Sequence, residues 1–127
     1  MRVTAHFEMS EFNCKDGTPV PVEYQGNVVA LCLALEQLRV RLGEPVTIVS
    51  GYRTVLYNEE VGGAPKSQHL TASAADVRVP RHTPEKIAQC FEEMISNGIV
   101  CQGGLGVYSI HNFVHYDIRL YRARWGM

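Results

Sequence analysis

Residues 27–53 read NVVALCLALEQLRVRLGEPVTIVSGYR, and this stretch predicts a helix followed by a strand. Asn27 is a suitable N-cap and Gly43 a natural C-terminal stop, so we expect a helix over residues 28–42. The run at residues 46–49 is rich in β-branched side chains and predicts a short buried strand. The apolar positions of the helix recur at steps of three and four residues; they are Val28, Leu31, Cys32, Leu35, Leu38 and Leu42.

A second helix is predicted after Thr83-Pro84-Glu85, which combines an N-cap, a proline at the first helical position and an acid in the first turn. Gly98 would end it after about Asn97. Between the two helices, the sequence predicts a short helix over residues 54–61, a loop over 64–73 and a strand over 74–79. After the second helix, it predicts strands over 104–109 and 113–119.

Residues 1–26 predict an irregular N-terminal arm, because turn-forming residues at 15–19 and Pro21 discourage a helix. The length of 127 residues fits one domain over 1–127. Together the elements predict an α+β fold, with two main helices packed on a small, largely antiparallel sheet.

Composition excludes several classes of protein. The chain is 46% hydrophobic and 20% charged, with a net charge of -1, so nothing indicates binding to nucleic acid. No apolar run is long enough to span a bilayer. Residues 1–10 lack the apolar stretch of a signal peptide. The four cysteines form no C-x-x-C pair and predict buried free thiols rather than a cysteine metal site.

His69, Asp76 and His115 form a candidate zinc site. His69 falls in the predicted loop, Asp76 in the next strand and His115 in the last strand. Two imidazoles and a carboxylate are three ligands, which leaves a fourth coordination position open, as a catalytic zinc requires. The spacing alone is weak evidence, because a histidine and an aspartate seven residues apart often occur by chance.

The segments around these residues strengthen the case. Taken in order, they resemble the zinc D-Ala-D-Ala carboxypeptidase family, and within it the short single-domain branch of phages and bacteria. The resemblance covers nearly the whole chain. The matching segments are Ser50-Gly51-Tyr52-Arg53, Ser67-Gln68-His69, Ala74-Ala75-Asp76, Gly103-Gly104-Leu105-Gly106 and Phe113-Val114-His115-Tyr116-Asp117.

The resemblance implies a fold like that of hedgehog and the D-Ala-D-Ala peptidases, with His69, Asp76 and His115 as zinc ligands. It implies that Arg53 binds a substrate carboxylate or stabilises the oxyanion, tasks that suit a planar, permanently charged side chain. Ser67 matches a residue at the substrate-binding edge, although a turn or helix-cap role is an equal alternative.

The chain departs from the family pattern at two positions. The glycine between the histidine and aspartate ligands is Ala72 here, and alanine does not easily adopt positive φ, so we expect a slightly different loop. Many relatives carry an acid three residues before the last zinc histidine as general base. That residue is Asn112 here, which cannot take a proton.

Asp117 is the best local substitute for the missing base. In a strand it shares a face with His115, so it either accepts the proton of the attacking water or orients His115. His111 lies on the same face if the strand is regular, and is a weaker candidate for proton transfer or oxyanion binding. Tyr108 is a candidate hydrogen-bond donor to substrate, with packing as the alternative.

The sequence therefore predicts a zinc peptidase acting on peptidoglycan stem peptides, either as a carboxypeptidase or as a cross-link endopeptidase. It would be made in the cytoplasm and reach the wall by phage lysis, in a phage particle or by secretion. Two alternatives remain: a non-catalytic zinc- or wall-binding module, which the Asn112 departure favours, and a metal-free structural domain.

Overall fold

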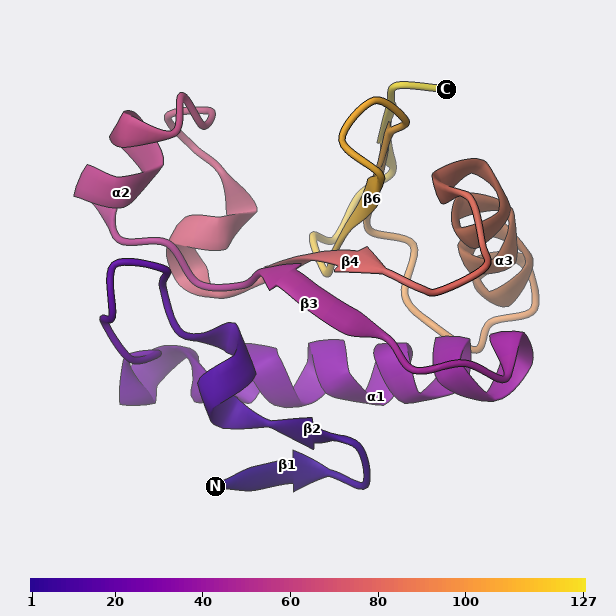
Figure 1. The fold of residues 1–127 in the computed structure, drawn as a ribbon, viewed down its shortest axis with the longest axis horizontal. Helices are drawn as coiled ribbons and strands as arrows, with labels where there is room; N and C mark the ends of the chain where they lie inside the picture. The colour runs from indigo at the N-terminus through magenta and orange to yellow at the C-terminus, as the bar shows by residue number, and fades with distance from the viewer.

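A five-stranded sheet forms the centre of the fold, and the hydrophobic core lies between it and the two long helices (Figure 1). The computed structural model describes residues 1–127. None of the helices combines the length and the apolar character needed to cross a membrane. The elements are β1 Arg2–Thr4, β2 Phe7–Glu8, α1 Gln25–Leu42, β3 Thr47–Ser50, α2 Val55–Glu60, β4 Ala74–Arg78, α3 Pro84–Ser96, β5 Gly104–Tyr108, β6 Phe113–Asp117 and β7 Ala123–Trp125.

The strand order is β3-β4-β6-β5-β7, and every pairing is antiparallel except that of β5 with β7. The predicted α+β class and largely antiparallel sheet are thus confirmed, although the last strand makes the sheet mixed. β3 is an edge strand rather than the fully buried one expected, because it has a neighbour on one side only. Ile48 is its one buried residue.

Helix α1 begins earlier than predicted. It follows a 3-10 turn over Val22–Tyr24 and starts at Gln25, so Tyr24 rather than Asn27 is the N-cap residue. The Asn27 side chain instead donates to the carbonyl oxygen of Thr71, 2.9 Å away, and ties α1 to the loop before β4. Gly43 ends the helix with φ 66°, as predicted.

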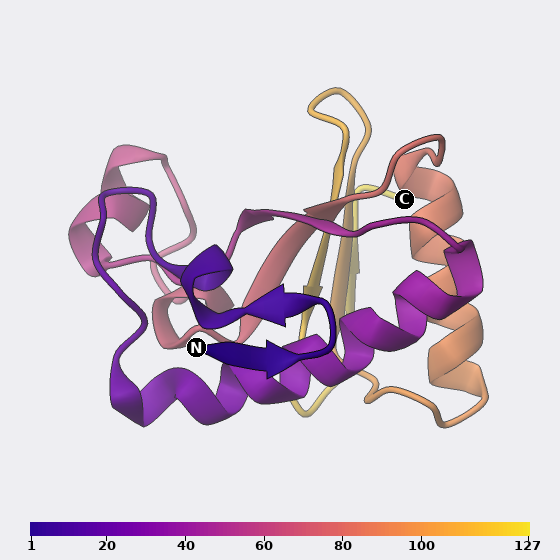
Figure 2. The same ribbon diagram turned by 60° about the horizontal axis from the view of Figure 1, so that its bottom comes forward.

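Helix α3 begins as its sequence predicts. The Thr83 hydroxyl accepts from the amide of Lys86 at 3.2 Å, and Pro84 is the first helical residue. The ring of Phe91 stacks on that of Tyr116, with centroids 4.6 Å apart. Because side chains alternate along a strand, this contact places α3 on the face of β6 opposite His115. Figure 2 shows α3 alongside the strands of the sheet.

The N-terminal arm is more ordered than the sequence predicts. β1 and β2 pair as a hairpin beside α1, and Phe7 and Phe12 are fully buried in the core. The amide of Tyr52 donates to the carbonyl of Phe12 at 2.8 Å. A Cβ on Gly51 would lie 2.7 Å from the Phe12 Cα, so only glycine fits there. The arm therefore supports the segment that leads to Arg53.

Replacing Phe12 with alanine tests whether the arm belongs to the core. We expect Phe12→Ala to lower the free energy of unfolding by about 3–5 kcal/mol, because it leaves a cavity at a fully buried site. Urea unfolding in excess chelator measures this without a contribution from metal. Val22→Ala, at a position 83% exposed, serves as the control and should change stability by less than about 0.5 kcal/mol. Equal effects of the two substitutions would contradict the core assignment.

Candidate metal centre

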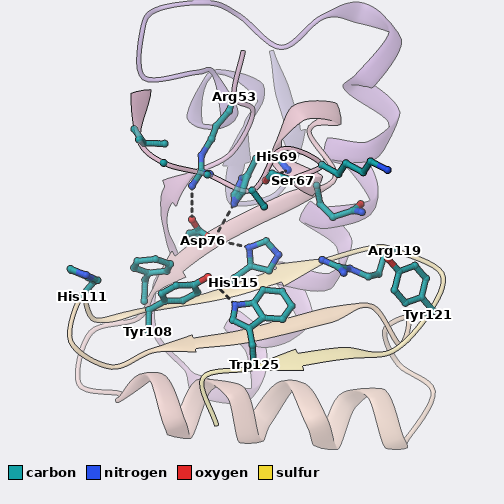
Figure 3. A pocket seen from close by; sticks show the side chains of 17 residues that line it. Arg53, Ser67, His69, Asp76, Tyr108, His111, His115, Arg119, Tyr121 and Trp125 are labelled. Carbon is teal, nitrogen blue, oxygen red and sulfur yellow. Dashed lines mark hydrogen bonds and ion pairs between the residues drawn. The ribbon is translucent and has the colours of Figure 1, made fainter. Parts of the chain in front are cut away.

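One row of residues runs across four strands on the face of the sheet opposite α3. Asp76 of β4 pairs with His115 of β6, His115 pairs with Gly106 of β5, and Gly106 pairs with Trp125 of β7. His69 comes from outside the sheet, in a 3-10 turn over Gln68–Thr71. The row and this turn bring His69, Asp76 and His115 together, each of them buried (Figure 3).

Hydrogen bonds to the backbone of His69 hold the loop that carries this residue. The Ser67 hydroxyl caps the 3-10 turn by accepting from the amide of His69 at 3.1 Å. The His69 carbonyl in turn accepts from the amide of Arg53 at 2.9 Å. Ser67 thus has the capping contact that was one of its two predicted alternatives, and it also lines the cavity described below.

Ala72 adopts the left-handed conformation that the sequence analysis considered unfavourable, with φ 55°. Its amide donates to the His69 carbonyl at 3.2 Å, and its side chain is buried in the core. An alanine thus adopts the positive φ that glycine adopts easily, because burial of the methyl group and the surrounding hydrogen bonds offset a strain of about 1–2 kcal/mol.

Two of the separations between the three ligand atoms match the edges of a tetrahedral zinc site. Asp76 Oδ1 lies 3.2 Å from His69 Nε2 and 3.1 Å from His115 Nδ1, and all three atoms lie within 4.8 Å of one another. A tetrahedron with zinc–ligand bonds of about 2.0–2.1 Å has edges of about 3.3 Å. The donor atoms therefore fit zinc in their chemistry, and the two separations from Asp76 fit it in size.

The hydrogen bond made by the second ring nitrogen of each histidine determines which tautomer the ring adopts. His69 Nδ1 donates to the Gly51 carbonyl at 2.6 Å, and His115 Nε2 donates to Asp117 Oδ2 at 2.7 Å. Since both partners can only accept, the nitrogens facing Asp76 carry lone pairs when the rings are neutral. Three electron-rich atoms thus converge on one point, an arrangement that a cation stabilises.

The ionisation of the ligands agrees with this reading. Burial alone would raise the pKa of Asp76, but the contacts with His115 and His69 outweigh it and hold the pKa below its usual value. Burial alone would lower the pKa of His115, yet the carboxylates of Asp117 and Asp76 raise it overall. Both pKa shifts have the same cause: the buried carboxylate of Asp76 favours a positive charge beside it, whether a proton or a metal ion.

Asp117 has the geometry of a residue that orients His115. It is completely buried and does not line the cavity. Besides His115, its oxygens accept from the amide of Gly104 at 2.9 Å and from Arg119 Nε and Nη2 at 2.8 and 2.7 Å. Burial opposes ionisation of Asp117, but these contacts keep its pKa below the usual value. A carboxylate so engaged is poorly placed to take a proton from a water molecule in the cavity.

A cavity of about 630 Å³ opens above the three ligand atoms. Arg53 lines it and lies near the ligands, with Nη2 3.4 Å from Asp76 Oδ2 and Nη1 3.2 Å from Asn58 Oδ1. Tyr108 points into the cavity from the end of β5 (Figure 3). Apart from the ligand Asp76, no acidic residue lines it, whereas Arg53, Lys66 and Arg119 do.

The turn between β5 and β6 differs from expectation. Asn112 has φ 55° and ends the extended backbone, so β6 begins at Phe113 and His111 lies in the turn rather than on the strand. His111 is exposed at the outer edge of the cavity (Figure 3). Asn112 does not line the cavity, so it supplies no group to the site.

Sequence reasoning missed the contribution of the C-terminal residues. Arg119, Tyr121 and Trp125 all line the cavity, although none of them is among the site residues predicted from the sequence. A signal was present in the alternating glycines of β5. A Cβ on Gly104 would lie 2.3 Å from Asp117 Oδ2, and one on Gly106 would lie 2.2 Å from Trp125 Nε1. These glycines leave the room that the site side chains occupy.

A family model described as Peptidase M15 matches residues 5–117. The chain belongs to the peptidase M15 family. The match confirms the resemblance predicted from the sequence and supports a zinc-dependent metallopeptidase, with the buried group of His69, Asp76 and His115 able to hold the metal. A search of curated proteins found no match.

The role of Asp117 in this M15 peptidase can be measured by zinc titration of the metal-free protein. Trp125 is the only tryptophan and its ring centroid lies 5.0 Å from that of His115, so its fluorescence should report metal binding. We expect Asp117→Asn to weaken zinc binding about 10- to 100-fold, because it disturbs the partner that orients His115. Glu93→Gln, the same exchange at an exposed position of α3, should have no effect. Unchanged zinc affinity in Asp117→Asn would contradict the orienting role.

Proposed function

We propose that this protein hydrolyses an amide bond in the stem peptides of peptidoglycan, as a D-Ala-D-Ala carboxypeptidase or as a cross-link endopeptidase. The observation that carries the proposal is the buried group of two histidines and one aspartate at the base of an open cavity, inside a chain of the M15 peptidase family. Three protein ligands leave one coordination position for the chemistry, which distinguishes a catalytic zinc site from a closed structural one.

The charge of the cavity supports an anionic peptide as substrate. Arg53, Lys66 and Arg119 line it, while its one carboxylate is the ligand Asp76. Arg119 is paired with Asp117 and Arg53 contacts the ligand Asp76, so Lys66 is the cationic side chain of the cavity without an acidic partner. Stem peptides carry carboxylates at their D-Ala terminus and on their acidic residues, which makes them suitable partners for this surface.

The chain's own residues then have distinct tasks. A bound zinc ion supplies Lewis-acid chemistry, polarising the amide carbonyl and making water more acidic. Arg53 binds the substrate carboxylate or stabilises the negative charge that develops on the carbonyl oxygen, because its guanidinium lies beside the metal ligands. Tyr108 donates a hydrogen bond to the same oxygen. Ser67 and His111 contact the substrate at the two edges of the cavity.

Proton transfer falls to His111 in this proposal. Asp117 is enclosed behind His115, and Asn112 lies outside the cavity, which leaves His111 as the one imidazole that lines the cavity without being a metal ligand. From its position at the outer edge, it would take the proton of the attacking water through a second water molecule and return it to the leaving amine.

A non-catalytic zinc- or wall-binding module is the second candidate. The observation that favours it is the lack of any carboxylate lining the cavity except the ligand Asp76. Such a module would keep the zinc ligands and the cationic surface, and would bind stem peptides without releasing new amino groups. For either function we propose delivery to the wall by phage lysis, in a phage particle or by secretion.

Digestion of purified peptidoglycan by the zinc-loaded protein tests the activity, with products identified by mass spectrometry. Loss of single D-Ala residues would identify a carboxypeptidase, and separated cross-bridges an endopeptidase. We expect His69→Ala to abolish both zinc binding and cleavage, because it removes a ligand. His82→Ala, at a histidine outside the cavity, should leave both intact. Cleavage by the His69→Ala protein would refute the proposed mechanism, and binding without chelator-sensitive products would favour the second candidate.

The assignment of His111 has its own test. We expect His111→Gln to lower kcat/KM by on the order of 10²-fold, the usual contribution of a general base, with zinc content unchanged. Steady-state cleavage of a synthetic stem peptide, with metal analysis of the same sample, measures both quantities. If His111→Gln retains full activity, the proton acceptor is another group.

A further inference from the structure

Trp125 lines the cavity, and the proposed function gives it no role. It lies in β7, opposite Gly106 of the parallel strand β5, and its indole lines the cavity. The residues matched by the M15 family model end at 117, so Trp125 lies outside the matched region. The last strand of the sheet thus adds an aromatic wall to the metal centre (Figure 3).

The indole contacts three groups that matter to the site. Its centroid lies 5.0 Å from that of the ligand His115, and the guanidinium carbon of Arg119 lies 5.5 Å from it. Its Nε1 lies 2.8 Å from the hydroxyl oxygen of Tyr108. This last contact has a defined direction, because an indole nitrogen can only donate, so the Tyr108 oxygen is the acceptor.

The ring of Tyr108 is fixed from the other side as well. It stacks on Phe113 with centroids 4.4 Å apart and an interplanar angle of 14°. With the ring held by Phe113 and one lone pair of the oxygen occupied by Trp125, the hydroxyl proton is directed away from the indole. Both Tyr108 and Trp125 line the cavity, so that proton is available to an acceptor inside it.

The space for this contact is provided by Gly106. A Cβ at that position would lie 2.2 Å from Trp125 Nε1 and 2.3 Å from the neighbouring ring carbon, which leaves no room for any other residue without displacing the indole. The indole can therefore occupy this position only because residue 106 is glycine. In that position the indole is the hydrogen-bond partner of the Tyr108 hydroxyl.

We propose that Trp125 is a positioning residue, whose N–H aims the Tyr108 hydroxyl at the oxygen that becomes negatively charged during amide hydrolysis. The part that concerns the reaction rests on the proposed function. The hydrogen bond itself does not, because it joins two side chains of this protein and can be measured without substrate or metal.

The contact is tested first in the metal-free protein. The single tryptophan gives one indole N–H resonance in a proton–nitrogen NMR spectrum. We expect this proton to be shifted downfield and protected from exchange with water, and to lose both properties in Tyr108→Phe. Tyr24→Phe, at a tyrosine outside the cavity, should leave the resonance unchanged. An exposed, rapidly exchanging indole in the unaltered protein would overturn the proposal.

The role in the reaction is tested by combining two substitutions. We expect Tyr108→Phe to lower kcat on the order of 10²-fold, as the loss of one oxyanion donor does. Trp125→Phe keeps an aromatic ring but removes the N–H, and should lower kcat at least about tenfold with little change in KM. When Tyr108 is already Phe, Trp125→Phe should have almost no further effect, because its partner is gone. Zinc content should be equal in all four proteins.

The outcomes separate this inference from the proposed function. Independent, multiplying losses in the double variant would show that Trp125 acts by packing alone, and would overturn the positioning role. If the unaltered protein binds zinc, shows the protected indole and cleaves no peptidoglycan, the proposed function fails together with the oxyanion role. The hydrogen bond between Trp125 and Tyr108 would then stand as a structural feature only.

Discussion

The buried carboxylate of Asp76 is the constraint on which the site depends. One of its oxygens faces a nitrogen of His69 and a nitrogen of His115, and the other faces Arg53. A carboxylate at 3% exposure is costly unless positive charge accompanies it. This charge lies on β4, an inner strand of the sheet, so the neighbouring elements must supply partners for it.

The alternation of side chains along each strand separates the polar groups of the site from the apolar core. On β6, His115 and Asp117 face the cavity side while Val114 and Tyr116 face the core. On β5, glycines occupy the cavity side, so Asp117 and the indole of Trp125 can lie across the strand. One face of the sheet therefore carries a series of hydrogen-bonded polar side chains, from His115 to Asp117 and then to Arg119. The other face carries the continuous apolar core.

Local patterns predicted most of the elements, and the resemblance to a known family indicated the three candidate ligands. The ends of α3 and the C-terminal end of α1 were readable, because caps and stops act within a few residues. The hairpin of the arm was not, since strands of two and three residues leave no periodic pattern. The start of α1 was misassigned because the Asn27 side chain bonds to Thr71, a partner 44 positions away in the sequence.

By itself, the sequence determined the fold class, the family and the three residues that could hold a metal, because short-range periodicity and the ordered motifs of the family carry that information. Only the tertiary structure places Asp117 behind His115, His111 at the edge of the cavity and Trp125 in its wall. Whether Asp117 faces a water or a histidine depends on strand pairing and on Arg119. Trp125 reaches the metal centre through a parallel pairing with β5, and contacts between segments distant in sequence have no signature in either segment alone.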